Sequence, residues 1–196
     1  MKNSSYKPRL YLLLVLSVIL LYFLINFIAK MYNFSSPISE ETSRRFQSNL
    51  DHVKNNFSSL EGKKIGFVFK KVNDGSAEAK KYPLIRYEII IDIDELKNIS
   101  DFELRGLFSH ELAHLESYSK LNWLQLGTFA IFYSISDGFK KKVERATDIR
   151  TIEKGFGKEL LAFREYRLRT ASENDKKILM TYYLSPDEIK SFAGIN

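Results

Sequence analysis

The feature that most restricts the fold of this chain is a long apolar stretch near its amino terminus. Residues 10–28 read LYLLLVLSVILLYFLINFI, in which only Ser17 and Asn26 are polar and no residue is charged. A helix of this length extends about 28 Å, close to the hydrocarbon thickness of a bilayer. A cleaved signal peptide has a shorter apolar core that ends in small residues, unlike the residues that follow here. The sequence therefore predicts a retained transmembrane anchor over residues 10–29.

The anchor divides the chain into unequal parts. Residues 1–9 form a basic tail and residues 30–39 a linker, which leaves residues 40–196 as one domain of ordinary size. The basic residues of the tail lie close to the span, so the positive-inside rule favours a cytoplasmic amino terminus. We therefore expect a single-pass membrane protein, with lipid as a partner and the domain outside the cytoplasm.

Hydrophobic periodicity and capping signals predict an α+β domain that is mostly helical with a small sheet. Helices begin where a Ser cap precedes acidic residues, as at Ser39, and in the capping boxes that start at Ser100 and Ser185. Strands are indicated by runs of β-branched and aromatic residues. The patterns predict helices over about 40–58, 100–120, 138–154 and 158–171, a short last helix after 185, and strands over 63–72 and 86–93.

Composition excludes several classes of site and partner. The chain has no cysteine, which rules out disulfides, thiol catalysis and cysteine-ligated metal centres. Its net charge of +6 is spread along the chain, without the basic stripe and interleaved aromatics that nucleic-acid binding favours. We therefore do not expect nucleic acid as a partner. No pattern indicates the oligomeric state.

The segment His110-Glu111-Leu112-Ala113-His114 falls inside the helix predicted over 100–120. Two histidines four residues apart stand side by side on one helix face, so their rings can converge on one cation. Glu111 lies beside the pair and can reach a water molecule next to that cation. This arrangement of two histidines and a glutamate is the H-E-x-x-H pattern, which predicts a zinc site.

A catalytic zinc ion needs a third protein ligand. Cysteine is absent and His52 belongs to a different predicted helix, so a carboxylate must serve. Glu144 is favoured over Glu116 and Glu153, because Glu144 and Asp148 share one face of a predicted helix. Asp148 would then accept a hydrogen bond from a ligand histidine and fix the orientation of its ring.

Residues 121–136 form a second apolar stretch. It cannot be a full span if Glu144 is a ligand, because a span would place His114 and Glu144 about 30 Å apart on opposite sides of the bilayer. Sixteen residues are also too few for two spans. We expect either a buried core helix or a segment that lies along the membrane surface.

His110-Glu111-x-x-His114 followed by Glu144-x-x-x-Asp148 resembles the gluzincin metallopeptidases. With the predicted anchor, the pattern is most similar to the Ste24/HtpX-like membrane peptidases and to the minigluzincins. The resemblance covers about residues 100–157. It implies a zincin-like fold and zinc-dependent hydrolysis of peptide bonds in a peptide or protein substrate.

The resemblance also assigns roles to single residues. His110, His114 and Glu144 would hold one Zn²⁺ ion, and Glu111 would be the general base and then the general acid. An edge strand beside the active-site helix would pair with extended substrate. That strand is taken to be residues 86–93, with Ile89, Ile90 and Ile91 as its centre, and the candidate oxyanion donors are Arg164, Tyr166, Arg167 and Tyr182.

The alternative is a non-catalytic or latent membrane-tethered binding protein that retains the scaffold. Glu111 distinguishes the two readings, because a purely structural zinc site does not need it. Its presence favours an enzyme.

Overall fold

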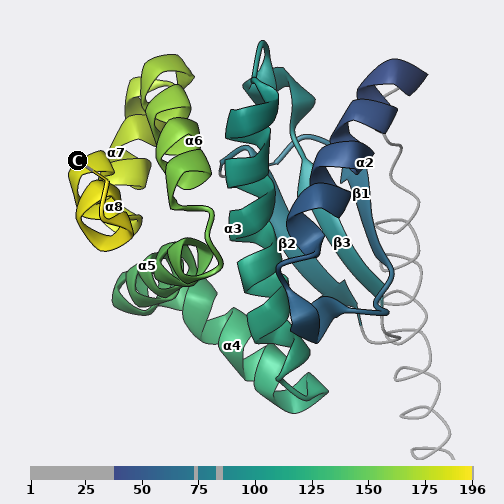
Figure 1. The fold of residues 1–196 in the computed structure, drawn as a ribbon. Coiled ribbons are helices and arrows are strands. Elements are labelled where there is room, and N and C mark those ends of the chain that lie inside the picture. The colour runs from purple at the N-terminus through teal and green to yellow at the C-terminus, as the bar shows by residue number, and fades with distance from the viewer. Residues whose placement is uncertain (1–37, 73–74, 83–85, 196) are drawn as a thin grey trace, which may run out of the picture. The chain divides into compact units, whose positions relative to one another are not determined.

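The computed structural model describes residues 38–72, 75–82 and 86–195. The predicted tail, the predicted anchor over residues 10–29 and most of the linker lie outside these ranges. The part that is described is mostly helical with a small sheet, which confirms the α+β expectation (Figure 1).

The sheet has three strands, β1 (Ile65–Phe69), β2 (Ala77–Tyr82) and β3 (Arg86–Ile91), in the order β1-β3-β2. β3 is central, parallel to β1 and antiparallel to β2. All of its residues except Arg86 are buried, in agreement with its continuous apolar run. The prediction that residues 86–93 form an edge strand for substrate is therefore wrong. Ile89, Ile90 and Ile91 are buried and paired on both sides.

Two helices pack beside each other against the sheet. α2 (Glu40–Lys54) begins at Ser39, whose side chain accepts a hydrogen bond from the Thr42 amide, and ends earlier than predicted. α3 (Asp101–Ser119) begins with the predicted capping box of Ser100 and Glu103. Short 3₁₀ turns, η1 (Ser58–Leu60) and η2 (Ile93–Leu96), precede the first strand and α3. The core between helices and sheet contains edge-to-face contacts of Phe46 with Phe69 and Phe108.

The carboxyl-terminal helices lie on the opposite side of α3 from the sheet (Figure 1). These are α5 (Asp137–Glu153), α6 (Gly157–Thr170), α7 (Glu173–Tyr182) and α8 (Pro186–Ala193). The bounds of α5 and α6 and the start of α8 were predicted to within about one residue, whereas α7 and strand β2 were not predicted. α6 packs closely on α3, because Gly106 has no side chain: a Cβ there would lie 2.1 Å from the carbonyl oxygen of Glu159. α3 is thus held between two layers.

The apolar segment after α3 forms α4 (Trp123–Ile135), in which no residue is buried. The expectation of a buried core helix is therefore wrong. Among the described residues, no helix is both long enough and apolar enough to cross a membrane. α4 contacts α5, which follows it directly.

Candidate metal centre

The two histidines predicted as ligands lie on adjacent turns of α3 and face α5. Both side chains are largely buried, and their Nε2 atoms are 3.2 Å apart. The rings meet edge to face, with centroids separated by 4.8 Å. Their spacing of four residues produces this convergence, because such residues are neighbours on a helix face.

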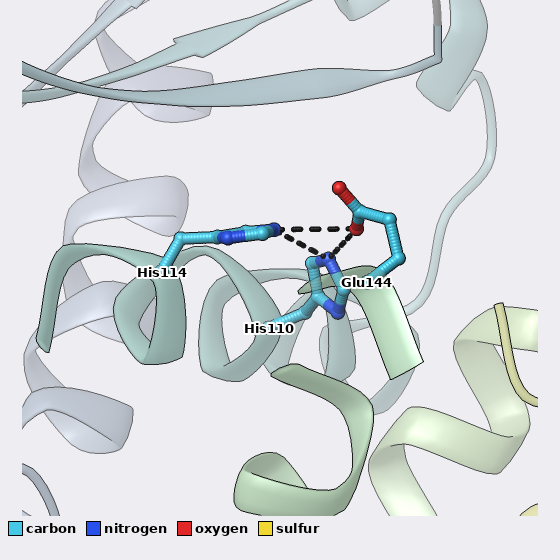
Figure 2. Close-up of side chains that lie close together, drawn as sticks. All are labelled: His110, His114 and Glu144. Atoms are coloured by element: carbon cyan, nitrogen blue, oxygen red, sulfur yellow. Dashed lines mark hydrogen bonds and ion pairs between the residues drawn. The ribbon is translucent and has the colours of Figure 1, made fainter. Parts of the chain in front are cut away.

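Glu144 of α5 completes the group, as predicted. One of its carboxylate oxygens, Oε2, lies 3.2 Å from Nε2 of His110 and 3.3 Å from Nε2 of His114. Figure 2 shows the carboxylate and the two rings pointing toward one another. Three ligand atoms, provided by two helices, thus form a nearly equilateral triangle inside the protein.

The size of this triangle fits a zinc ion. Zinc binds imidazole nitrogen and carboxylate oxygen at about 2.0–2.2 Å with tetrahedral geometry, so two ligand atoms of one ion are about 3.3–3.6 Å apart. The three separations of 3.2–3.3 Å are close to that value. Two imidazoles and one carboxylate are also a ligand set known from catalytic zinc sites. The residues present therefore fit zinc.

The outer nitrogen of His110 has the predicted partner. His110 Nδ1 lies 2.8 Å from Oδ1 of Asp148. Asp148 is fully buried and also accepts hydrogen bonds from the guanidinium of Arg164, at 2.9 and 3.1 Å, and from the Leu184 amide, at 2.9 Å. A proton on Nδ1 leaves Nε2 free to bind a cation.

The outer nitrogen of His114 has a partner that sequence reasoning missed. Thr147 Oγ1 donates to the Val143 carbonyl and lies 3.3 Å from His114 Nδ1. Because its proton is used, the hydroxyl can accept a hydrogen bond from Nδ1–H. Thr147 lies three residues after Glu144 on the same helix, so the helical period could have identified it.

A second missed residue, Tyr133 of α4, donates a hydrogen bond to Glu144 Oε1. This leaves Oε2 as the carboxylate oxygen nearest both histidines. No spacing in the sequence connects Tyr133 to the site, because α4 folds back on α5 through contacts such as that between the Phe129 and Phe139 rings.

Electrostatics of the group follow from burial and proximity. Burial opposes protonation of His110, but hydrogen bonds to Asp148 and Glu144, and their charges, raise its pKa to about 10. Burial alone would raise the pKa of Glu144, yet His114 and His110 lower it well below its usual value. Glu144 is therefore ionised, the form in which a carboxylate ligates metal. A cation at the triangle would replace the proton of His110, since ligation needs the neutral ring.

Glu111 lies beside the triangle, and burial raises its pKa, an effect partly offset by the charges of His110 and His114. A cavity of about 1080 Å³ adjoins Glu111 and the three ligand residues. Its walls come from β2, α3, α4, α5 and α7, and include Tyr118, Tyr133 and Tyr183. The strand beside the site is thus β2, which sequence reasoning did not predict.

The predicted oxyanion donors have other partners. Arg164 is paired with Asp148, and Arg167 with Glu95. The Tyr166 hydroxyl donates to the Glu95 and Lys97 carbonyls, and the Tyr182 hydroxyl to Asp137.

The residues weighed against Glu144 do not join the metal group. Glu116 is paired with Lys154 and Arg150, and Glu153 and His52 are exposed. Among the described residues, the group that could hold a metal consists of His110, His114 and Glu144.

Comparison of the chain with protein-family models, with curated proteins and with solved structures gave no match.

Proposed function

We propose that this chain is a zinc-dependent peptidase with a zincin-like catalytic domain, held at a membrane by its amino-terminal apolar run. The observation that carries the proposal is the buried triangle of His110, His114 and Glu144 with Glu111 beside it, next to a cavity large enough for a substrate. A purely structural zinc site usually has four protein ligands and no neighbouring base.

In the proposed hydrolysis, the zinc ion and the protein side chains have separate roles. A zinc ion held by His110, His114 and Glu144 would supply a Lewis acid, which lowers the pKa of water and polarises a carbonyl. Glu111 accepts the proton of the attacking water and passes it to the leaving amine. Burial supports this role, since a carboxylate with a raised pKa is a better base and a better acid near neutral pH.

The substrate in this proposal is an extended peptide lying along β2. β2 pairs with β3 on one side, and no described strand pairs with its other side. The residues of β2 line the cavity that contains Glu111. An added strand gains affinity from main-chain hydrogen bonds, which suits a peptide of varied sequence.

Tyr183 is the best-placed side chain to stabilise the oxyanion. It lines the cavity, and its ring centroid lies 5.6 Å from that of His110. The Arg164 guanidinium covers its ring at 4.5 Å and holds it in place. Burial raises the pKa of Tyr183 well above its usual value, so the hydroxyl keeps the proton that it donates.

Metal content and cleavage, measured together on the full chain in detergent, test the proposal. We expect bound zinc and cleavage of an unfolded labelled protein by the wild type, and equal zinc with activity lower by about 100-fold or more for Glu111→Gln. Glu165→Gln, an exposed acid of α6, is the matched control and should change neither property. Glu144→Gln should lose the metal.

The alternative is a tethered binding protein that retains the scaffold without catalysis. Zinc in the wild type and in Glu111→Gln without cleavage by either would support that alternative. Absence of zinc from the wild type after exposure to the ion would refute both.

A further inference from the structure

One face of α4 lines the cavity, whereas its outward face has no function in the proposed catalytic mechanism and is unusually apolar for a helix in water. No charged residue occurs between Leu121 and Ser136. The outward stripe of Leu124, Thr128, Ile131 and Ile135 recurs at helical spacing, and its three aliphatic side chains are 59–74% exposed. Trp123 and Phe132, beside the stripe, are 74% and 50% exposed. Exposed apolar patches of this kind mark sites of association.

The polar groups of α4 are satisfied within the helix. The Thr128 hydroxyl donates to the Leu124 carbonyl and the Ser134 hydroxyl to the Ala130 carbonyl. At the amino-terminal end, Asn122 and Gln125 form a capping box. Transfer of this helix from water into an apolar phase would therefore leave few polar groups without partners, which removes the main cost of burial in lipid.

Basic side chains border the apolar stripe at both ends. Lys120 precedes α4, and Lys140, Lys141 and Lys142 follow it, against a single acid, Asp137. Of these lysines, Lys120, Lys141 and Lys142 are exposed. An apolar helix with a terminal tryptophan and flanking lysines has the chemistry of a segment that lies in the interface of an anionic bilayer.

The length of α4 excludes a span and agrees with an interfacial position. Thirteen residues extend only about 20 Å, against about 30 Å of hydrocarbon. The apolar run at residues 10–28 offers a bilayer in reach. About eleven residues join it to α2 and can extend to about 40 Å. α2 lies beside the amino-terminal end of α3, where Arg45 pairs with Asp101, and α4 follows the other end. Because α3 is only about 28 Å long, a linker that extends to about 40 Å can cover the length of α3.

We infer that α4 docks on the surface of an anionic lipid bilayer through Leu124, Ile131, Phe132 and Ile135, with Trp123 at the lipid–water boundary. The opposite face of α4 contributes Leu126, Phe129 and Tyr133 to the wall of the cavity. Docking would therefore place one wall of the cavity at the lipid surface, where a substrate segment leaving the membrane would meet it. The lipid contact itself does not depend on peptidase activity.

The chain contains a single tryptophan, so Trp123 fluorescence reports on α4 in the unmodified full chain. The protein is reconstituted into phosphatidylcholine vesicles with and without phosphatidylglycerol, and with brominated acyl chains as the lipid-borne quencher. In the anionic vesicles we expect a blue-shifted emission, quenching by the brominated chains and reduced quenching by aqueous acrylamide, relative to detergent. The readout is independent of cleavage and of metal.

Two variants sharpen the test. Replacement of Leu124, Ile131 and Ile135 by Gln removes the apolar stripe without touching the cavity wall, and should restore quenching by acrylamide. The matched control replaces Phe102, Met180 and Phe192, exposed apolar residues of α3, α7 and α8, by Gln and should leave the emission unchanged. Lys141→Gln with Lys142→Gln should lower the ratio of lipid-bound to free α4 by about fivefold per lysine.

The inference would be overturned if, in both kinds of vesicle, acrylamide quenched Trp123 fluorescence fully and brominated lipid did not quench it. Shielding of Trp123 that rises with protein concentration in detergent and is unaffected by lipid would also overturn it, and would identify a second copy of the chain as the occupant of this surface.

Discussion

Replacing Gly106 by alanine tests how firmly α3, the helix that carries His110 and His114, is held by its neighbour α6. A Cβ at this position would lie 2.1 Å from the Glu159 carbonyl oxygen, 2.6 Å from its carbon and 2.8 Å from the Phe163 Cβ. Two of these three atoms belong to the backbone of α6, so no rotamer change relieves the clash. Overpacking costs about 1–3 kcal/mol, and because the two closest atoms are backbone atoms, this site falls at the upper end, about 2–3 kcal/mol. The gain in helix propensity from Gly to Ala returns about 1 kcal/mol.

The net expectation for Gly106→Ala is a loss of about 1–2 kcal/mol, which in a chain of this size lowers Tm by about 2–8 °C. Gly127→Ala in α4 is the matched control, because a Cβ there meets nothing within 4 Å. It changes helix propensity alone and should leave Tm equal or slightly higher. Thermal unfolding of both variants and the wild type in one detergent, followed by far-UV circular dichroism, gives the comparison. If Gly106→Ala melted at or above the wild-type temperature, the close packing of α3 on α6 would be refuted.

Three further substitutions examine single contacts of the site and the fold. Asp148→Asn removes the charge that Arg164 and His110 share. It should lower the free energy of unfolding in chemical denaturation by about 3–5 kcal/mol, and zinc affinity, measured by competition with a chelator, by about 10–100-fold. Unchanged affinity would contradict the role of Asp148. Thr147→Val should weaken zinc binding by about 10-fold while Thr147→Ser does not, and equal losses in both would refute the hydrogen bond to His114. The hydrogen bonds from Arg145 and the Ser185 amide lower the pKa of Glu188 from 4.5 to about 2. The stability that the Arg145–Glu188 pair contributes is therefore present above pH 4.5 and is lost as the pH falls toward 2. Because the pair is partly exposed, Glu188→Gln should be only about 1 kcal/mol less stable than the wild type at pH 7. This difference should vanish near pH 2.

The elements that could be predicted from the sequence are those with local signals. Ser100 and Ser185 begin capping boxes in which the cap and the third helical residue bond each other, so four residues are enough to place a helix start. Strand β2 lacks such a signal. Its residues, AEAKKY, have weak strand propensity, and the strand forms because it pairs with β3 and because Lys81 donates to the Tyr118 and Leu121 carbonyls. The strand beside the cavity was misassigned for this reason.

The residues of the candidate metal centre likewise fall into those that local spacing predicts and those that it does not. His110, His114, Glu144 and Asp148 were identified because each pair occurs within one helix, where spacing determines the shared face. Arg164 was taken for an oxyanion donor, but it binds Asp148. Its role depends on which face of α6 meets α5, and that is decided by tertiary packing. Tyr133 and Tyr183, each brought in by a separate segment, have no spacing relation to the ligands.

Asp148 connects the candidate metal centre to the packing of the carboxyl-terminal helices. Its two oxygens bind His110 on α3, Arg164 on α6 and the Leu184 amide between α7 and α8. A cation at His110 keeps the Nδ1 proton in place and so preserves the hydrogen bond to Asp148. Ligands that bind only the native state stabilise it in proportion to RT ln(1 + [L]/Kd), about 2.7 kcal/mol at a hundredfold excess over Kd. Because of this connection, metal binding should slow amide exchange at Leu184 and in α6 as well as in α3, which a site isolated on α3 and α5 would not do.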